Sequence, residues 1–130
     1  MIAFRLDAHS GVSPYLQIVQ QVRQALRLGF LHEGDQLPTV KEVVARLAIN
    51  PNTVSKAYRE LEYEGLVAAR PGVGTFVTKI LSDESLAAHG PLRAELERWI
   101  AKARRAGMDE ESIAALVEDT IRGATEEGVA

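Results

Sequence analysis

Residues 50–65, NPNTVSKAYRELEYEG, decide the fold and have the features of a single helix with well-defined ends. Asn50 is a good N-cap, and Pro51 suits the first helical position, where no backbone N–H is needed. Gly65 favours the left-handed conformation that closes a helix. The spacing predicts a buried stripe of apolar side chains, formed by Val54, Ala57, Tyr58 and Leu61.

The opposite face of this helix is polar and cationic, with Asn52, Thr53, Ser55, Lys56 and Arg59. Side chains of these types bond phosphates and base edges, so the pattern predicts a recognition helix for DNA. Asn52 and Thr53 also fit a simpler role as polar support for the first helical turn. Arg59 has an equally simple alternative, because it can pair with Glu62 or lie against Tyr63.

The segment before this helix, residues 37–47, predicts a second, shorter helix. Thr39 and Glu42 have the spacing of a capping box, and the inner face would consist of Val43, Val44 and Leu47. Only two or three residues separate its end from Asn50. Two helices joined by so short a turn form a helix-turn-helix, and the second of them is the recognition helix.

The segment after the recognition helix predicts a β-hairpin. Residues 66–70 and 75–79 have the composition of strands, and residues 71–74, PGVG, form a glycine-rich tip between them. A helix-turn-helix followed by a hairpin is a winged helix. Arg70 is the cation placed for a DNA contact in the wing, and Gly72 allows the backbone to approach a phosphate closely.

The N-terminal residues complete this unit. Residues 2–7, IAFRLD, alternate in polarity and predict a short edge strand. Ser13 and Pro14 then start an amphipathic helix that ends near Gly29. Residues 32–38, HEGDQLP, have the composition of a turn. The aromatic rings of Tyr15, Tyr58 and Phe76 are expected in the core.

The C-terminal part predicts two further helices. Pro91 opens the first helix, Gly107 ends it, and Asp109 caps the second. An antiparallel pair of such helices cannot bury both apolar stripes alone, so it needs a partner surface. We expect a dimer interface formed by Leu92, Leu96, Trp99, Ile100, Ile113, Leu116, Val117 and Ile121. A ligand-lining role is the alternative for Trp99.

The expected fold class is therefore mainly α with a small β-hairpin. A winged helix-turn-helix DNA-binding domain occupies residues 1–79, and a linker covers residues 80–90. An α-helical hairpin for dimerisation covers residues 91–130.

Composition is that of a soluble globular protein, and charge alone is a weak signal for DNA binding. Hydrophobic residues make up 46% and charged residues 25% of the 130 positions, which excludes the disordered class. The net charge is −3, but the acidic excess lies beyond the DNA-binding part, since residues 80–130 carry eleven acidic and six basic side chains. The absence of cysteine fits the cytoplasm, and no apolar run is long enough for a membrane span.

Other function classes find little support in the sequence. The histidines are far apart and lack the spacing of zinc ligands, so we expect no metal and no cofactor. Ser55 has no base or nucleophile elbow, which argues against an enzyme. The competing hypothesis is a winged helix that acts as a protein–protein adaptor. The polar and cationic face of the recognition helix argues against it, because an adaptor favours apolar anchors.

Three segments resemble the N-terminal domain of the GntR family of bacterial transcription regulators: PYLQIVQQVRQAL, GDQLPTVKEVVARLAINPNTVSKAYRELEYEGLV and RPGVGTFV. The resemblance covers residues 12–78. Its motifs occur in the family's order, as Leu37-Pro38, Asn52-Thr53-Val54, Leu61-Glu62-x-Glu64-Gly65 and Gly72-x-Gly74-Thr75-Phe76-Val77. The short two-helix tail resembles that of the YtrA subfamily, whereas most other subfamilies carry larger effector domains.

This resemblance implies a winged-helix homodimer that binds a palindromic operator on double-stranded DNA, usually as a repressor and often of a transporter operon. The family's DNA contacts, carried over by motif position, fall on Thr39, Lys41, Asn50, Asn52, Thr53, Ser55, Lys56, Arg70 and Gly72. The family commonly has arginine in place of Lys41. Lysine keeps the charge for a phosphate but lacks the planar fork that reads guanine. The sequence identifies no small-molecule effector and leaves activation open beside repression.

Overall fold

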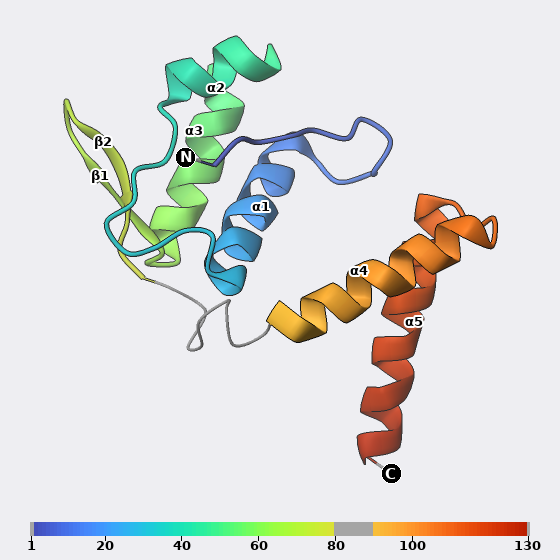
Figure 1. Cartoon of the computed structure of the whole chain (residues 1–130). Coiled ribbons are helices and arrows are strands. Elements are labelled where there is room, and N and C mark those ends of the chain that lie inside the picture. Colours follow the sequence, from blue (N-terminus) through green and yellow to red (C-terminus); the bar gives the residue numbers. More distant parts are fainter. Residues whose placement is uncertain (1, 80–89, 130) are drawn as a thin grey trace. The chain divides into compact units, whose positions relative to one another are not determined.

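The computed structural model describes residues 2–79 and 90–129, which belong to two compact units (Figure 1). The boundary between the units lies within residues 80–89, so the predicted linker falls almost entirely outside the described residues. The elements, in chain order, are α1 (Pro14–Leu28), α2 (Val40–Leu47), α3 (Pro51–Tyr63), β1 (Val67–Arg70), β2 (Gly74–Val77), α4 (Gly90–Arg105) and α5 (Glu110–Val129). This arrangement confirms a winged helix followed by two C-terminal helices.

The helices of the first unit begin and end where the local sequence signals place them. Helix α1 starts at Pro14 and closes at Gly29, whose φ of 80° is left-handed. The predicted capping box at the start of α2 is present, with the Glu42 N–H donating to Thr39 Oγ1 at 3.1 Å. At the start of α3, the Asn52 N–H donates to Asn50 Oδ1 at 2.8 Å. Local polar groups therefore satisfy the free N–H groups at the starts of α2 and α3.

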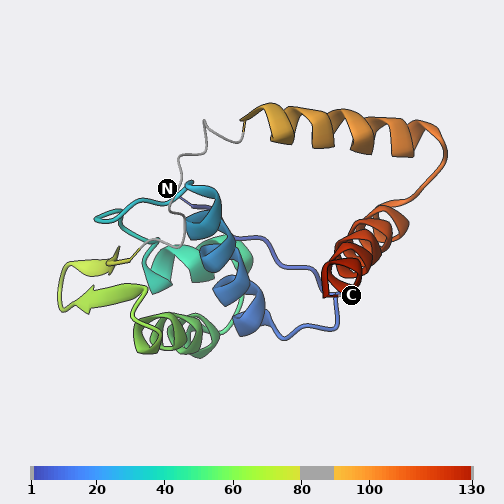
Figure 2. The same ribbon diagram turned by 90° about the horizontal axis from the view of Figure 1, so that it is seen from below.

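The core of the first unit lies between α1 and α3, with α2 packed against α3 (Figure 2). The predicted stripe of α3 is buried, and Val54 and Leu61 are inaccessible to solvent. The one buried hydroxyl of this stripe belongs to Tyr58, which donates to the carbonyl of Pro38 at 2.6 Å. Burial raises the pKa of Tyr58 well above its usual range, and the charge of nearby Glu42 adds to the rise. Tyr58 therefore remains a neutral donor that ties α3 to the start of α2.

The wing contains a third extended segment that the sequence did not predict. Strands β1 and β2 pair antiparallel from Val67↔Val77 to Arg70↔Gly74. Residues 34–37, expected only to form a turn, also pair with β2, since the Leu37 N–H donates to the carbonyl of Thr75 at 2.9 Å. The Val77 N–H in turn donates to the carbonyl of Asp35 at 2.8 Å. These bonds fix the wing to the segment that leads into α2.

The prediction of an edge strand over residues 2–7 is wrong. This segment is extended but has no strand partner, because side-chain amides from α1 take the place of a neighbouring strand. The amide oxygen of Gln21 accepts the Arg5 N–H at 3.0 Å, and that of Gln17 accepts the Asp7 N–H at 2.8 Å. Phe4 is buried in the core, and Ile2 and Leu6 pack against it, while two glutamines bond the backbone of the segment.

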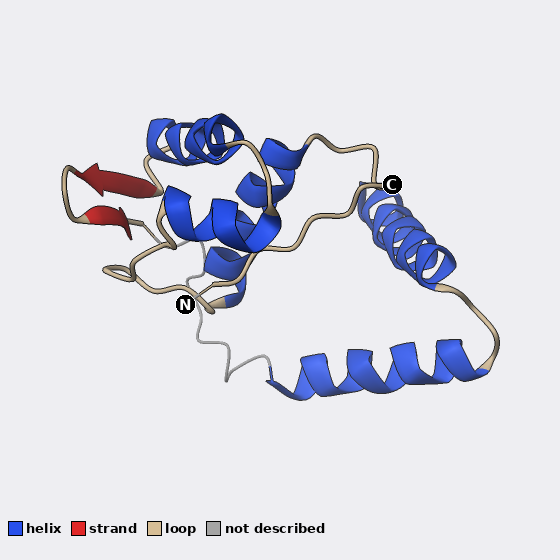
Figure 3. Cartoon of the chain, turned by 90° about the horizontal axis from the view of Figure 1, so that it is seen from above, coloured by secondary structure: helices blue, strands red, loops and turns tan. Residues whose placement is uncertain are grey.

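The second unit consists of α4 and α5, joined by a short turn at the predicted position. Gly107, with a φ of 94°, follows the last turn of α4, and Asp109 Oδ1 accepts the Ser112 N–H at 2.7 Å at the start of α5. This bond lowers the pKa of Asp109. The two helices diverge from the turn (Figure 3), and the buried hydrophobic residues among the described residues of this unit, Ala103 and Ile113, lie close to the turn. Within residues 2–79 and 90–129, no helix has the length and apolar content needed to cross a membrane.

Candidate nucleic-acid interface

All nine residues predicted to contact DNA lie in the first unit, on three neighbouring elements. Helix α3 packs against both α2 and β1, so the start of α2 and the wing both adjoin the recognition helix. Thr39 and Lys41 belong to the start of α2, and Arg70 and Gly72 belong to the wing. The remaining residues lie at the start and middle of α3, namely Asn50, Asn52, Thr53, Ser55 and Lys56.

Helix α3 has one buried and one exposed face, as the sequence predicted. Asn52, Lys56 and Arg59 are exposed, and their spacing of four and three residues places them in one stripe along the helix. Thr53 and Ser55 are half-buried at the edges of that stripe. We name Asn52, Lys56 and Arg59 the recognition stripe. It presents one amide and two cations, which suit base edges and phosphates.

Two acidic residues at the C-terminal end of α3, Glu62 and Glu64, are engaged in structural contacts. Glu62 Oε2 accepts the backbone N–H of Ala69 in β1 at 2.8 Å. Glu64 Oε1 accepts two bonds from the guanidinium of Arg23 in α1, at 2.6 and 3.1 Å. Glu62 therefore fixes the base of the wing, and Glu64 ties α3 to α1, while both carboxylates lie beyond the recognition stripe. The spacing along α3 suggests Arg59 as a partner of Glu62, whereas the wing contact depends on how β1 packs on α3.

Two cations proposed for DNA contact lie over aromatic rings. Lys56 Nζ is 4.0 Å from the centroid of the Tyr15 ring, and Arg70 Cζ is 4.6 Å from the centroid of the Phe76 ring. Both rings were expected in the core, but they are half-buried, and each turns one side towards a cation. Only the third aromatic residue, Tyr58, is buried as predicted. The first pair could not be predicted from the sequence, because Tyr15 and Lys56 come together only when α1 packs on α3.

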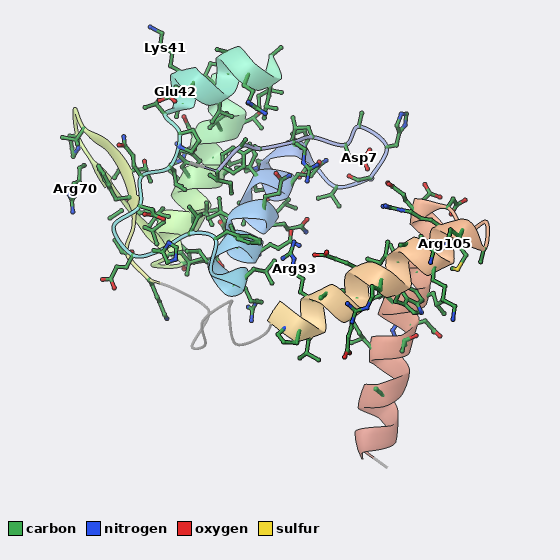
Figure 4. All side chains as sticks on the ribbon, viewed as in Figure 1. Asp7, Lys41, Glu42, Arg70, Arg93 and Arg105 are labelled. Carbon is green, nitrogen blue, oxygen red and sulfur yellow. The ribbon has the colours of Figure 1, made fainter. Side chains whose placement is uncertain are left out.

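The predicted contact residues on α2 and in the wing differ in whether their polar groups are already hydrogen-bonded within the protein. Lys41 extends from α2 into solvent, and Arg70 lies beside the wing (Figure 4). The Thr39 hydroxyl is already engaged, since it accepts from the Glu42 N–H and donates to Glu42 Oε1 at 3.0 Å. Gly72 has a φ of 76°, and the turn is closed by the Val73 N–H bonded to the carbonyl of Arg70 at 2.9 Å. That positive φ favours glycine on conformational grounds alone.

The predicted dimer residues lie on α4 and α5 in the second unit. Leu92, Leu96 and Trp99 on α4 are 64%, 47% and 37% exposed, which is high for large apolar side chains. Ile113 instead is buried within its own unit. The other predicted members differ in exposure, with Leu116 and Ile121 exposed and Ile100 and Val117 half-buried. The residues farther from the turn therefore present most of the apolar surface.

Metal binding finds no support in the described part of the chain, where no three histidine, aspartate or glutamate side chains gather closely enough to hold an ion. The polar groups of the first unit instead suit contacts to phosphates and base edges.

Comparison with known proteins agrees with this geometry. A family model described as bacterial regulatory proteins, gntR family, matches residues 14–77, which run from the start of α1 to the end of β2. The HTH-type transcriptional repressor YtrA of Bacillus subtilis is 34% identical over 112 residues, which make up 84% of this chain and 85% of that protein.

Two solved structures are similar over most of the chain. A transcriptional regulator from Oenococcus oeni is 35% identical, with a TM-score of 0.50 and coverage of 91% of this chain and 99% of that one. YtrA from Sulfolobus acidocaldarius, a GntR-family transcription factor, is 28% identical, with a TM-score of 0.55 and coverage of 75% and 97%. Both similarities cover more residues than the winged helix contains, so they extend beyond it.

Proposed function

The chain belongs to the GntR family of bacterial regulatory proteins and is a transcription regulator with a DNA-binding domain, and from this premise we propose that it is a homodimeric repressor that binds a palindromic operator. The observation that carries the proposal is the recognition stripe of α3, which is exposed, polar and cationic. The start of α2 and the wing adjoin α3 and can add contacts to the same DNA. Its relatives are regulators rather than enzymes, and we propose no catalytic activity. Acting on the bacterial chromosome, it would work in the cytoplasm.

In this proposal each protomer inserts the start of α3 into a major groove. Asn52 contacts base edges, and Lys56 with Asn50, Thr53 and Ser55 contacts bases or phosphates near the helix start. The wing lies along the neighbouring backbone, where Arg70 meets a phosphate and Gly72 permits close approach of the main chain. Thr39 and Lys41 add contacts from α2.

Lys41 is proposed as a phosphate contact rather than a reader of guanine. Its ammonium group is a compact charge on a flexible stem, and it lacks the two parallel donors that an arginine presents to a guanine. Its exposed position at the start of α2 supports this role. The Thr39 hydroxyl is engaged by Glu42, so a DNA contact through this residue would use its free acceptor capacity or its backbone.

The second unit supports the proposed dimer. Large apolar side chains on α4 remain exposed, and pairing with a second copy would remove them from water. A two-fold pair of such chains would present two recognition helices to half-sites about one helical turn apart, or a multiple of it. Such a two-fold dimer would bind a palindromic operator. The Bacillus subtilis relative is a transcriptional repressor, and this supports repression, which would act by blocking the promoter. A transporter operon remains the proposed target.

The DNA contacts can be tested by fluorescence anisotropy. The operator would first be selected from random duplexes and then compared with DNA from upstream of the protein's own gene. We expect tight binding that resists random competitor and weakens steeply with salt. Lys56→Ala and Arg70→Ala should each weaken binding and reduce the salt slope by about one phosphate contact.

Arg27→Ala is the matched control, because this exposed cation lies in the last turn of α1, at the opposite end of that helix from Tyr15. It should leave affinity and slope unchanged. If Lys56→Ala and Arg70→Ala behaved like Arg27→Ala, the assignment of these contacts would be wrong. If no sequence were selected above random DNA, the adaptor hypothesis would replace DNA recognition, and a protein partner should then be sought.

The dimer can be tested by sedimentation. Trp99→Glu places a charge within the exposed apolar stripe of α4 and should yield monomers that retain a folded first unit and bind the full operator weakly. Arg98→Glu changes charge at the neighbouring exposed position and serves as the control. A wild-type chain that sediments as a monomer at micromolar concentration would contradict the dimer.

A further inference from the structure

Two aromatic rings support the cations proposed to contact DNA, and the arrangement is the same in two separate elements. We propose that Tyr15 and Phe76 are positioning residues, whose rings hold Lys56 and Arg70 in the orientation that DNA requires before DNA arrives. This inference rests on the proposed DNA contacts of those two cations. It adds a function for two residues that the sequence assigned to the core.

The first pair joins α1 to α3. Tyr15 is the second residue of α1 and packs against the edge of the core, so its ring is half-buried and fixed. Lys56 is exposed in the recognition stripe, and its Nζ lies 4.0 Å from the ring centroid, well within the range of a cation–π contact. A core-anchored ring therefore holds a side chain that is otherwise flexible through its whole length.

The second pair lies across the two strands of the wing. Phe76 is directly opposite Ala68 in the register, and Arg70 is two residues further along β1. Residues two apart on a strand share one face, so Arg70 is the diagonal neighbour of the Phe76 ring. Its Cζ lies 4.6 Å from the ring centroid. Planar guanidinium groups stack well on aromatic faces, which leaves the edge donors free for a phosphate.

The advantage of such support is entropic. A long cationic side chain that binds a phosphate loses rotamer freedom, and a side chain held beforehand loses less of it on binding. The ring does not neutralise the cation, so the attraction to the phosphate remains. We expect each ring to improve affinity by about threefold to tenfold without changing the number of phosphates contacted.

Other cations near the interface provide an internal comparison. Lys41 and Arg59 are exposed, and within the described ranges the cation-on-ring contacts are those of Lys56 and Arg70. The proposal therefore predicts coupling between Tyr15 and Lys56 and between Phe76 and Arg70. It predicts no coupling between Tyr15 and Lys41.

The experiment is a double-mutant cycle measured by operator anisotropy at several salt concentrations. Tyr15→Leu removes the ring but keeps an apolar side chain of similar packing, and it is measured with Lys56 and with Lys56→Ala. We expect Tyr15→Leu to weaken binding by about threefold to tenfold in the presence of Lys56 and to have no effect when Lys56→Ala is also present. The salt slope should fall with Lys56→Ala but not with Tyr15→Leu. Phe76→Leu with Arg70→Ala repeats the cycle in the wing.

Conservative variants separate positioning from packing. Tyr15→Phe and Phe76→Tyr keep the rings and should retain wild-type affinity and coupling. Thermal melting of each variant checks that the first unit is folded. In the free protein, NMR should show ring-current shifts of the Lys56 ε-methylene protons that disappear in Tyr15→Leu, a readout that a merely structural role of the ring elsewhere would not move.

The outcomes distinguish the positioning role of the rings from the DNA contacts of the cations. Equal weakening by Tyr15→Leu with and without Lys56, or tighter binding after loss of the ring, would overturn the positioning role while leaving the DNA contact intact. If Lys56→Ala changed neither affinity nor salt slope, the proposed contact would fail and the positioning role with it. A Tyr15→Leu effect that depends on Lys56, together with a salt slope that Tyr15→Leu leaves unchanged, supports the proposal.

Discussion

The two units of this chain use their apolar side chains in opposite ways. In the first unit α1, α2, α3 and the wing enclose one core, in which Ile18, Val54 and Leu61 are inaccessible to solvent. In the second unit Leu92, Leu96 and Trp99 remain exposed along α4. This difference in burial depends on how many elements pack together. An amphipathic helix buries its apolar face only against an opposing surface, and two diverging helices provide that surface only near their turn. The first unit thus encloses a core of its own, although scattered side chains such as Phe30 and Tyr63 are exposed, whereas the second unit leaves an apolar stripe of α4 exposed.

The polar groups of the two units show the same contrast. The buried amide of Gln17 binds three oxygens from the N-terminal segment, and the Tyr58 hydroxyl binds the carbonyl of Pro38. In the second unit the ion pairs of the described residues, such as Arg93 with Glu97, are exposed and lie along one helix or across the turn. Buried bonds specify one arrangement of a core, whereas exposed pairs contribute little to stability.

The largest expected effect on stability tests whether the core of the first unit is enclosed within that unit. Leu61→Ala should lower its free energy of unfolding by about 2–5 kcal/mol, because the side chain is fully buried and leaves a cavity. The loss should be independent of protein concentration. Urea unfolding followed by circular dichroism measures it.

Leu96→Ala in the second unit is the matched comparison for Leu61→Ala. Leu96 is 47% exposed, so its loss should change stability by less than about 0.5 kcal/mol in dilute protein. If the dimer forms, the effect should grow with protein concentration. Trp99 is the single tryptophan, and its fluorescence reports this unit separately. Equal and concentration-independent losses for both variants would contradict the comparison.

The next effect tests how firmly the wing belongs to the first unit. Gly74 has a φ of 147°, and a Cβ there would collide with the side-chain amide of Gln36, which donates to the carbonyl of Val73 at 3.3 Å. Gly74→Ala should therefore destabilise the unit by about 1–3 kcal/mol. Gly72→Ala is the control for backbone strain alone, since space around Gly72 is open.

The contribution of the Gln36 contact follows from a double variant. Gln36→Ala combined with Gly74→Ala should recover part of the loss, because the collision is removed and only the strain remains. Hydrogen exchange of the β2 amides, measured by NMR, would locate the change in the wing. An additive double variant would show that Gln36 does not determine the wing's position.

A smaller effect concerns the capping box of α2. Thr39→Ala should lower the free energy of unfolding by about 1 kcal/mol, because the Glu42 N–H loses its acceptor and the box is broken. Thr39→Ser keeps the hydroxyl and should retain most of the stability. Denaturant midpoints give the difference, and unchanged midpoints in Thr39→Ala would show that water caps this helix equally well.

The smallest effect concerns the equivalent cap of the second unit. The bond from the Ser112 N–H lowers the pKa of Asp109, so the ionised carboxylate stabilises the start of α5. This contribution to stability is complete above the ordinary pKa of an aspartate carboxyl group. It disappears as the pH falls through the lowered pKa of Asp109 in the folded protein. Asp109→Asn should remove this part of the pH dependence. Circular dichroism of the two proteins across acidic pH compares them, and identical pH profiles would exclude the contribution.

Most element boundaries could be predicted because the signals that set them are local. Pro14 and Gly29 bound α1, Thr39 and Glu42 start α2, and Asn50 with Pro51 starts α3. Each depends on groups within a few residues, such as a free N–H and the nearest side-chain oxygen. The mistaken strand at residues 2–7 shows the limit of this reasoning. Alternating polarity is local, but the glutamine amides that occupy the segment's backbone groups come from α1.

The sequence by itself determined the winged helix, its caps, its core stripe and the polar face of α3, because periodicity and capping act over one or two helical turns. Only the tertiary structure decided which groups the helices bring together across longer separations. It placed residues 34–37 on β2, Glu62 at the base of the wing, and the Tyr15 and Phe76 rings beneath two cations. The separation between Tyr15 and Lys56 is forty-one residues along the chain, and only the packing of α1 on α3 closes it.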